Sequence, residues 1–166
     1  MPSCSYPNRG IMGWSTRPVN AKDAQNGTTG GQGGIERCNG RLSCSTVFEL
    51  KPTSGGGWKE SVLYRFCSLG NCADGEAPYG SLTFDSAGNL YGTTSGGGDA
   101  KAQAGGVFEL TRNSKGGWSE RVLHRFLDHP GYAPMAGVIF DRAGNLYGTT
   151  FGDSISTSGS VFEITP

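Results

Sequence analysis

The sequence lacks long hydrophobic runs and an excess of charge of either sign. Of its 166 residues 17% are charged, and 14 basic residues balance 14 acidic ones, so the formal net charge is zero. This balance lacks the electrostatic footprint of a protein that binds nucleic acid or an anionic membrane. No run of 18 apolar residues occurs, so we expect no transmembrane helix and no direct membrane insertion.

The first 25 residues lack the pattern of a secretory signal and of the internal repeat described below. Residues 1–20 contain Arg9 and Arg17 but no continuous apolar core between them. We therefore expect residues 1–25 to form a poorly ordered lead-in.

Glycine and aromatic residues are abundant, with 29 Gly, 8 Phe, 6 Tyr and 3 Trp. Disorder goes with few aromatics, whereas this combination favours short aromatic-rich strands joined by glycine turns. No window has apolar residues at the helical period, and glycine interrupts nearly every run, so no helix is predicted.

One heptapeptide recurs along the chain. Gly-Asn-Leu-Tyr-Gly-Thr-Thr occupies residues 88–94 and returns unchanged at 144–150, 56 residues later, and a shortened copy, Asn-Gly-Thr-Thr, occupies 26–29. An Asp lies three residues before each complete copy, and Val-Phe-Glu follows all three. Self-similarity over tens of residues is typical of repeat architectures, in which each repeat is one supersecondary unit.

The complete repeat is interpreted as four antiparallel strands at 81–85, 89–94, 107–111 and 118–126. The last of these places Trp, Glu, Val, His and Phe on one face, with the period of two that a strand requires. The first unit should contain strands near 26–29, 47–50 and 58–66, and the last unit near 137–141, 145–150 and 160–165.

Four antiparallel strands per repeat are the signature of a β-propeller blade. We therefore predict an all-β fold, a β-propeller-like array of four-stranded antiparallel blades; a stacked antiparallel solenoid is the alternative. The domain would span 26–166, with partial blades at 26–66 and 137–166 and a complete blade at 81–126. These about two and a half blades would be an open arc or a fragment, since propellers close with 4–8 blades. Self-association or further repeats would complete the ring.

The recurring residues are predicted to be structural. The Asp before the heptapeptide can accept hydrogen bonds from turn amides, and the Gly after it fits a left-handed position in a hairpin loop. The Glu of Val-Phe-Glu could form a carboxylate ring for a cation, but its repetition in every unit favours an architectural role. The structural repeat residues are Asp85, Gly88, Asn89, Tyr91, Gly92, Asp141, Gly144, Asn145, Tyr147, Gly148, Glu49, Glu109 and Glu163.

Two further expectations concern single positions in the repeat. Gly88→Val should cost more stability than Gly97→Val, because Gly97 is assigned to a loose loop. Tyr91, Tyr147, Trp58 and Trp118 could form a sugar-stacking surface, but their period-two placement favours packing between units.

The five cysteines form two close pairs and one leftover. Cys38 and Cys44 bracket five residues, and Cys67 and Cys72 bracket four, so each pair could close one loop. Two such disulfides, with Cys4 unpaired, imply an oxidising compartment. Free thiols and a four-thiolate zinc site are the alternatives, but Cys-x5-Cys is wider than zinc ribbons use, and no metal site is predicted.

No set of residues predicts catalysis. The only histidines are His124 and His129, and the Asp beside His129 in sequence seldom gives the geometry of a catalytic triad. No Gly-x-Ser-x-Gly occurs, and the glycines at 96–98 are not followed by Lys-Ser or Lys-Thr, so a nucleophile elbow and a phosphate loop are rejected. We predict no catalytic residue and no cofactor.

The repeated pattern is Asp-x-x-Gly-Asn-Leu-Tyr-Gly-Thr-Thr, then Val-Phe-Glu-Leu, then Trp-x-Glu-x-Val-Leu-Tyr-x-Phe. From about residue 26 to 166 it resembles the GloVer tandem-repeat family, the "choice-of-anchor" proteins of bacterial surfaces. The resemblance implies an exported β-propeller fixed to the cell by a C-terminal anchor, without an agreed enzymatic activity. A signal peptide and an anchor segment are the two features of that pattern not seen in the sequence.

The expected function is therefore a non-enzymatic extracellular or cell-surface scaffold that binds a protein or glycan through loops at one face of the ring. The alternative is a propeller-type hydrolase or lyase that acts on a polysaccharide or a lactone. The loops at 95–106 and 151–159 are poor in His and carboxylates, which favours binding, because a catalytic site needs groups that converge.

Overall fold

The computed structural model describes residues 11–14, 25–29, 45–99, 101–127, 131–152 and 158–165. In these residues eleven strands are antiparallel, and the one helical element is a short 3-10 turn, η1 (Gly70–Cys72). The all-β class predicted from the glycine and aromatic content is confirmed.

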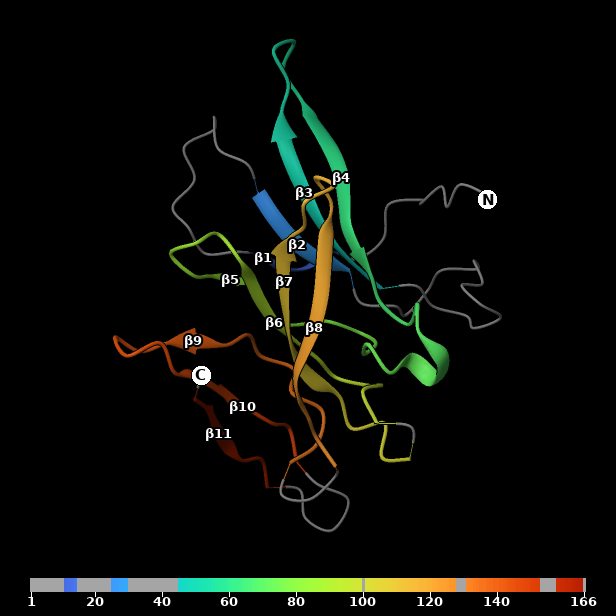
Figure 1. The fold of residues 1–166 in the computed structure, drawn as a ribbon, viewed down its shortest axis with the longest axis vertical. Helices are drawn as coiled ribbons and strands as arrows, with labels where there is room; N and C mark the ends of the chain where they lie inside the picture. Colours follow the sequence, from blue (N-terminus) through green and yellow to red (C-terminus); the bar gives the residue numbers. More distant parts are fainter. Residues whose placement is uncertain are drawn as a thin grey trace.

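The strands form three sheets in chain order (Figure 1). The first contains β1 (Ile11–Trp14), β2 (Gln25–Thr29), β3 (Thr46–Pro52) and β4 (Trp58–Arg65). The second contains β5 (Thr83–Phe84), β6 (Leu90–Thr94), β7 (Gly106–Arg112) and β8 (Trp118–Arg125). The third contains β9 (Ile139–Phe140), β10 (Leu146–Thr149) and β11 (Val161–Ile164). In each sheet every strand pairs with its neighbour in sequence, which makes three antiparallel meanders.

Strand β1 corrects two expectations, that residues 1–25 form only a lead-in and that the first unit lacks its opening strand. Ile11 lies opposite Thr29 and Met12 opposite Thr28 of β2, so the first sheet has four strands. The sequence of β1 does not match the repeat, and its pairing with β2 was therefore not predicted. The boundaries of the repeat domain stay a prediction.

The repeat places equivalent residues in equivalent register. Gly92 lies opposite Phe108 in the second sheet, and Gly148 lies opposite Phe162 in the third. A Cβ at Gly92 would lie 2.7 Å from Cζ of Phe108, and a Cβ at Gly148 would overlap the ring of Phe162. The second glycine of the heptapeptide is therefore required by the aromatic ring that packs over it.

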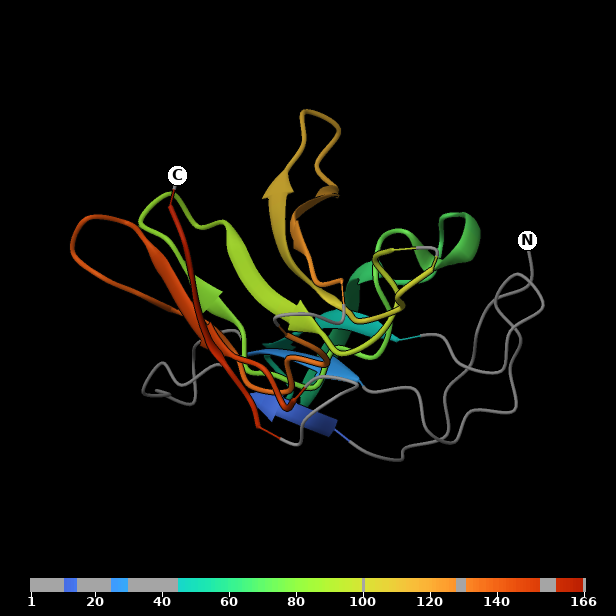
Figure 2. The same ribbon diagram turned by 90° about the horizontal axis from the view of Figure 1, so that it is seen from below.

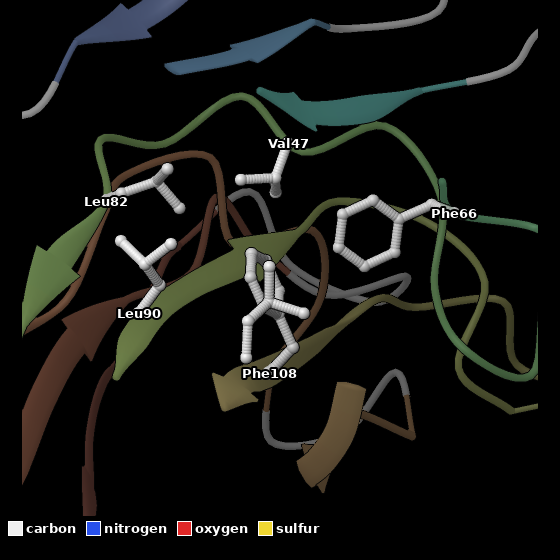
Figure 3. Packing of buried hydrophobic residues seen from close by; sticks show 6 residues of the cluster. Val47, Phe66, Leu82, Leu90 and Phe108 are labelled. Carbon is white, nitrogen blue, oxygen red and sulfur yellow. The ribbon is translucent and has the colours of Figure 1, made fainter. Parts of the chain in front are cut away.

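Two hydrophobic clusters join the three sheets face to face, with the second sheet between the other two (Figure 1, Figure 2). In the first cluster Val47 and Phe66 point toward Leu90 and Phe108 of the second sheet (Figure 3). The rings of Phe66 and Phe108 meet edge to face with centroids 4.8 Å apart. The second cluster repeats this contact, with Val107 and Phe126 packed against Leu146 and Phe162 of the third sheet.

A threonine also links each sheet to the loop before the next one. Thr28 Oγ1 donates to the carbonyl of Gly80 at 3.4 Å, and Thr93 Oγ1 donates to the carbonyl of Ala136 at 2.8 Å. Both residues are the first threonine of the Thr-Thr pair that ends the heptapeptide or its shortened copy. The same packing and the same hydrogen bond therefore recur at both junctions between sheets.

Candidate functional site

The Asp before the heptapeptide organises a tight turn. Asp85 Oδ1 accepts hydrogen bonds from the backbone N–H groups of Ala87 and Asn89, both at 2.9 Å. Its other oxygen, Oδ2, accepts from the side-chain amide of Asn89 at 2.8 Å. Gly88 has a φ of +86°, a left-handed conformation that favours glycine. A single carboxylate thus fixes the turn that leads into β6.

Tyr91 connects this turn to the Glu of Val-Phe-Glu. Its hydroxyl lies 2.7 Å from Oε1 of Glu109 and 3.1 Å from Oδ2 of Asp85. Arg121 donates to Oε2 of Glu109 from Nε and from a terminal nitrogen, at 2.9 and 2.7 Å. Both oxygens of the buried Glu109 therefore have donors within the second sheet.

The pKa values of this network follow from its contacts. Burial raises the pKa of the Asp85 carboxyl, but the hydrogen bonds from Asn89, Tyr91 and Ala87 outweigh burial and hold the pKa below its usual range. Burial raises the pKa of the Tyr91 hydroxyl well above its usual value, and the hydrogen bond to Glu109 raises it further. Both groups therefore keep one protonation state near neutral pH, which suits a structural role better than proton transfer.

The hydrogen bonds among Asp, Tyr and Glu recur in the third sheet, whereas in the first sheet the Glu has a different partner. Asp141 accepts hydrogen bonds from the turn amides of Ala143 and Asn145, and the hydroxyl of Tyr147 lies 2.7 Å from Oε1 of Glu163. In the first sheet Glu49 instead forms an ion pair with Lys51 at 2.9 Å. The three Glu residues thus lie in three separate sheets, and each has a hydrogen-bond or ion-pair partner of its own.

A different acidic cluster lies beside the loop that joins the first sheet to the second. Asp74 is buried and accepts hydrogen bonds from the backbone N–H groups of Ser68 and Leu69 and from the hydroxyls of Ser68 and Tyr64. Burial is the main reason that the pKa of the Tyr64 hydroxyl is raised. Asp74 therefore holds the 67–75 loop against β4.

Glu120 of β8 completes this cluster and is its one side chain with an unsatisfied atom. Its Oε1 is buried and has no hydrogen-bond partner among the described residues. Burial raises the pKa of this carboxyl to about 7, and the negative charge of Asp74 contributes to the rise. Neither Asp74 nor Glu120 was singled out from the sequence, because Asp74 lies outside the repeated motif and Glu120 occupies a strand position that Glu60 shares.

The 67–72 loop is closed by the predicted disulfide between Cys67 and Cys72. Their sulfur atoms and a carboxylate oxygen of Glu76 lie within 4.8 Å of one another, the spacing of metal ligands. A disulfide offers no thiolate to a metal, so in this state only the carboxylate of Glu76 remains as a ligand. The other predicted pair, Cys38 and Cys44, lies outside the described residues, as do Cys4 and His129.

The described parts of four long connections form one edge of the molecule, which we call the long-loop edge and define as residues 66–82, 95–99, 101–105, 126–127, 131–138, 150–152 and 158–160. In a meander alternate connections lie at opposite edges, so the tight turns after β3, β5, β7 and β9 occupy the other edge. The amide of Gly98 donates to the carbonyl of Cys72 at 2.8 Å, and the amide of Ala133 donates to that of Ala104 at 2.9 Å. The amide of Phe151 then reaches the carbonyl of Ala133 at 3.2 Å, so these loops form one connected layer.

This layer contradicts the assignment of Gly97 to a loose loop. A Cβ at Gly97 would lie 2.6 Å from the carbonyl oxygen of Cys72 and 2.9 Å from the backbone of Gly75. Gly97 also has a φ of +70°, whereas the surroundings of Gly88 are open. The sequence did not reveal this packing, because the contact joins segments 25 residues apart.

Exposed apolar side chains gather on the long-loop edge. Among the described residues, five of the eight large hydrophobic residues that are exposed lie there: Leu69, Leu127, Tyr132, Met135 and Phe151. Tyr132 and Phe151 are neighbours, because the amide of Phe151 donates to the carbonyl of Tyr132 at 3.1 Å. Two exposed aromatic residues on hydrogen-bonded backbone segments offer side chains against which a ligand can pack.

Comparison with known proteins does not assign a family or a function to this arrangement of sheets and loops. No family model, no curated protein and no solved structure matches the sequence. Among the described residues, none of the helical segments has the length and apolar character needed to cross a membrane.

Proposed function

We propose that this protein is a β-propeller-like binding scaffold that acts outside the cell or at its surface and holds a protein or glycan on its long-loop edge. The observation that carries the proposal is that five of the eight exposed large apolar side chains among the described residues lie on that edge, while the repeated carboxylates are engaged in hydrogen bonds within their own sheets.

The blade arrangement is supported by the way in which the sheets meet. Successive antiparallel meanders pack face to face, and each junction repeats one phenylalanine pair, Phe66 with Phe108 and Phe126 with Phe162. Propeller blades are four-stranded antiparallel sheets arranged by this kind of radial repetition. The heptapeptide and its Val-Phe-Glu partner are the residues that carry the resemblance to the GloVer repeat family, so we place the protein beside that family as a proposal.

An extracellular location is supported by the disulfide between Cys67 and Cys72, because disulfides form and persist in oxidising compartments. The disulfide also serves the proposed binding edge. It closes the loop whose carbonyl at Cys72 accepts the amide of Gly98, and it therefore helps to hold the layer of long loops in one conformation.

The buried carboxyl oxygen of Glu120 that has no partner among the described residues and the raised pKa of this group favour the alternative function, a hydrolase or lyase. A carboxyl with a pKa of about 7 is suited to general acid–base catalysis, and Tyr64 and Asp74 lie in the same cluster. We rank this alternative second for two reasons. The oxygens of Asp74, the other carboxylate of the cluster, are engaged in structural hydrogen bonds. The exposed Tyr132 and Phe151 lie on other loops than the 67–75 loop of this cluster.

A glycan array and a panel of immobilised extracellular proteins would test the binding proposal, with a hydrolase and lyase panel run beside them. We expect Tyr132→Ala and Phe151→Ala to abolish binding. Trp58→Ala should leave it unchanged, because Trp58 is an equally accessible aromatic residue at the opposite edge. Binding that survives both loop substitutions would overturn the proposed edge. Turnover that is lost in Glu120→Gln would establish the alternative.

A further inference from the structure

The two ends of the array expose residues that are covered inside it. The Val of Val-Phe-Glu occurs in every sheet, and the next sheet packs over it in the first two. Val47 and Val107 are 0% exposed, whereas Val161 of the third sheet is 77% exposed. The same valine of the repeat therefore lies in a core twice and in solvent once, and the difference is the presence of a following sheet.

The threonine that links the sheets shows the same contrast. Thr28 and Thr93 are each 1% exposed and donate to the loop before the next sheet. Thr149 occupies the equivalent place in β10 and is exposed. Ile139, which lies opposite Tyr147 in the register of β9 and β10, is also exposed. We call the face formed by Ile139, Thr149 and Val161 the trailing face.

The other end of the array carries the complementary surface. In the second sheet Leu110 is fully buried and Trp118 packs against the cluster shared with the first sheet. By register the equivalent residues of the first sheet are Leu50 and Trp58, since Pro52 lies opposite Trp58 as Arg112 lies opposite Trp118. Leu50 is half-buried and Trp58 is 48% exposed. We call the face formed by Leu50 and Trp58 the leading face.

We propose that the trailing face binds the leading face of a second copy of this chain, through the contact that already joins neighbouring sheets. The occupant is specified by the molecule itself, because both internal junctions seat a leading face of this type on a trailing face. The contact is head to tail, so it can close into a ring or extend into a filament.

Closure with two copies fits the number of sheets. The described residues of each copy form three sheets. Two copies therefore provide six, which lies within the 4–8 blades of closed propellers. The head-to-tail contact rests only on the repeated junction, whereas closure into a six-bladed ring rests on the proposed propeller arrangement.

Sedimentation of the full chain across a concentration series tests the proposal. Head-to-tail closure predicts a species of about 35 kDa, twice the 17.4 kDa of one chain, and no larger species. Val161→Glu and Trp58→Glu should each weaken the dimer by roughly 100-fold or more, because each homodimer would bury an unpaired carboxylate at both of its interfaces. Phe151→Glu changes an equally exposed apolar residue outside both faces and should leave the dimer intact. Circular dichroism confirms that each variant folds.

Mixing the two interface variants distinguishes head-to-tail contact from contact between two trailing faces. The Val161→Glu chain keeps its leading face and the Trp58→Glu chain keeps its trailing face, so the mixture should regain one intact interface and dimerise. A wild-type chain that is a monomer at every concentration would overturn the proposal. Dimerisation of Trp58→Glu alone would overturn the head-to-tail geometry, and growth into filaments would overturn the ring while leaving the contact. The sedimentation of the wild type and the mixing of the two variants both report on the dimer alone, and neither depends on a ligand at the long-loop edge.

Discussion

Asp85 accepts three hydrogen bonds from Ala87 and Asn89, and the hydroxyl of Tyr91 also lies 3.1 Å from it, whereas a buried oxygen of Glu120 has no partner in the described structure. The two carboxyls therefore respond to pH in opposite directions. The hydrogen bonds of Asp85 stabilise its charged form and lower its pKa, so its contribution to stability is lost only in acid. The pKa of Glu120 is raised to about 7 by burial, so its contribution changes between acid and neutral pH.

The first prediction concerns Glu120. Between its usual pKa of 4.5 and the folded-state pKa of about 7, the unfolded chain releases the proton while the folded chain holds it. The free energy of unfolding should therefore fall as the pH rises through this window. Glu120→Gln removes the titration, so the variant should match the wild type near the acid end of the window. Above pH 7 it should be more stable by about 1–2 kcal/mol, a value reduced for the water that reaches this half-buried group. Urea unfolding across the pH range measures this, and parallel curves for the two proteins would contradict it.

The second prediction compares two glycines with positive φ. Gly88→Ala should cost about 1–2 kcal/mol, because its left-handed conformation is strained for alanine but its surroundings are open. Gly97→Ala should cost more, about 3 kcal/mol or above, because its Cβ would also meet the carbonyl of Cys72 at 2.6 Å. Chemical denaturation of both variants gives the comparison. Equal losses would show that the loop at Gly97 moves away at little cost.

At the scale of the strands, each sheet is joined to the next by one apolar cluster and by few hydrogen bonds. The hydroxyl of Thr93 donates to Ala136, and that of Thr83 donates to Val138, both across the second junction. These bonds align the loop before β9 with β5 and with the end of β6. Strand β9 is two residues long, so these side-chain bonds add to its pairing with β10.

The third prediction tests the threonine link. Thr93→Val keeps the shape of the side chain but removes the donor to Ala136 and places a methyl group against that carbonyl. We expect a loss of about 1–2 kcal/mol. Thr149→Val is the matched control, because the residue is equivalent in the repeat and exposed, and it should change the stability of the dilute protein by less than about 0.5 kcal/mol. Similar losses for both would assign the cost to strand pairing instead of the link between sheets.

At the scale of the whole molecule, the two clusters connect only neighbouring sheets, with the second sheet common to both. In such an array stability is approximately a sum of unit and nearest-neighbour terms. The second sheet is stabilised from both sides and the third from one. The third sheet should therefore open more often than the second.

Hydrogen exchange tests this last prediction, because β6 and β10 contain the same Leu-Tyr-Gly-Thr sequence and have closely similar intrinsic exchange rates. We expect amides of β10 to exchange at least roughly tenfold faster than those of β6 in dilute protein. If the second copy covers the trailing face, protection of β10 should rise with concentration while that of β6 stays constant. Equal protection of the two strands in dilute monomer would show that the sheets unfold as one unit.

Much of the local structure followed from the sequence, because its causes are local. The turn at Asp85 depends on hydrogen bonds within a few residues. Alternation with a period of two located the strands, but the prediction that residues 118–126 share one face is wrong. A register shift between Val107 and Phe108 interrupts the alternation of β8, so Trp118 packs against the first cluster and Phe126 lies in the second. The disulfide between Cys67 and Cys72 was predictable for the same reason, since it closes a short loop. The all-β class was predictable from these signals together with the absence of a helical period.

Tertiary structure decided the features that depend on segments far apart. The pairing of β1 with β2, the backbone contact at Gly97 and the raised pKa of Glu120 all arise from neighbours that no local pattern specifies. Val107 and Val161 show the distinction most directly. Both are the valine of the repeated Val-Phe-Glu sequence, yet one lies in a core and the other in solvent. The sequence by itself determined that both residues are in strands, whereas burial depends on whether another sheet packs over that face.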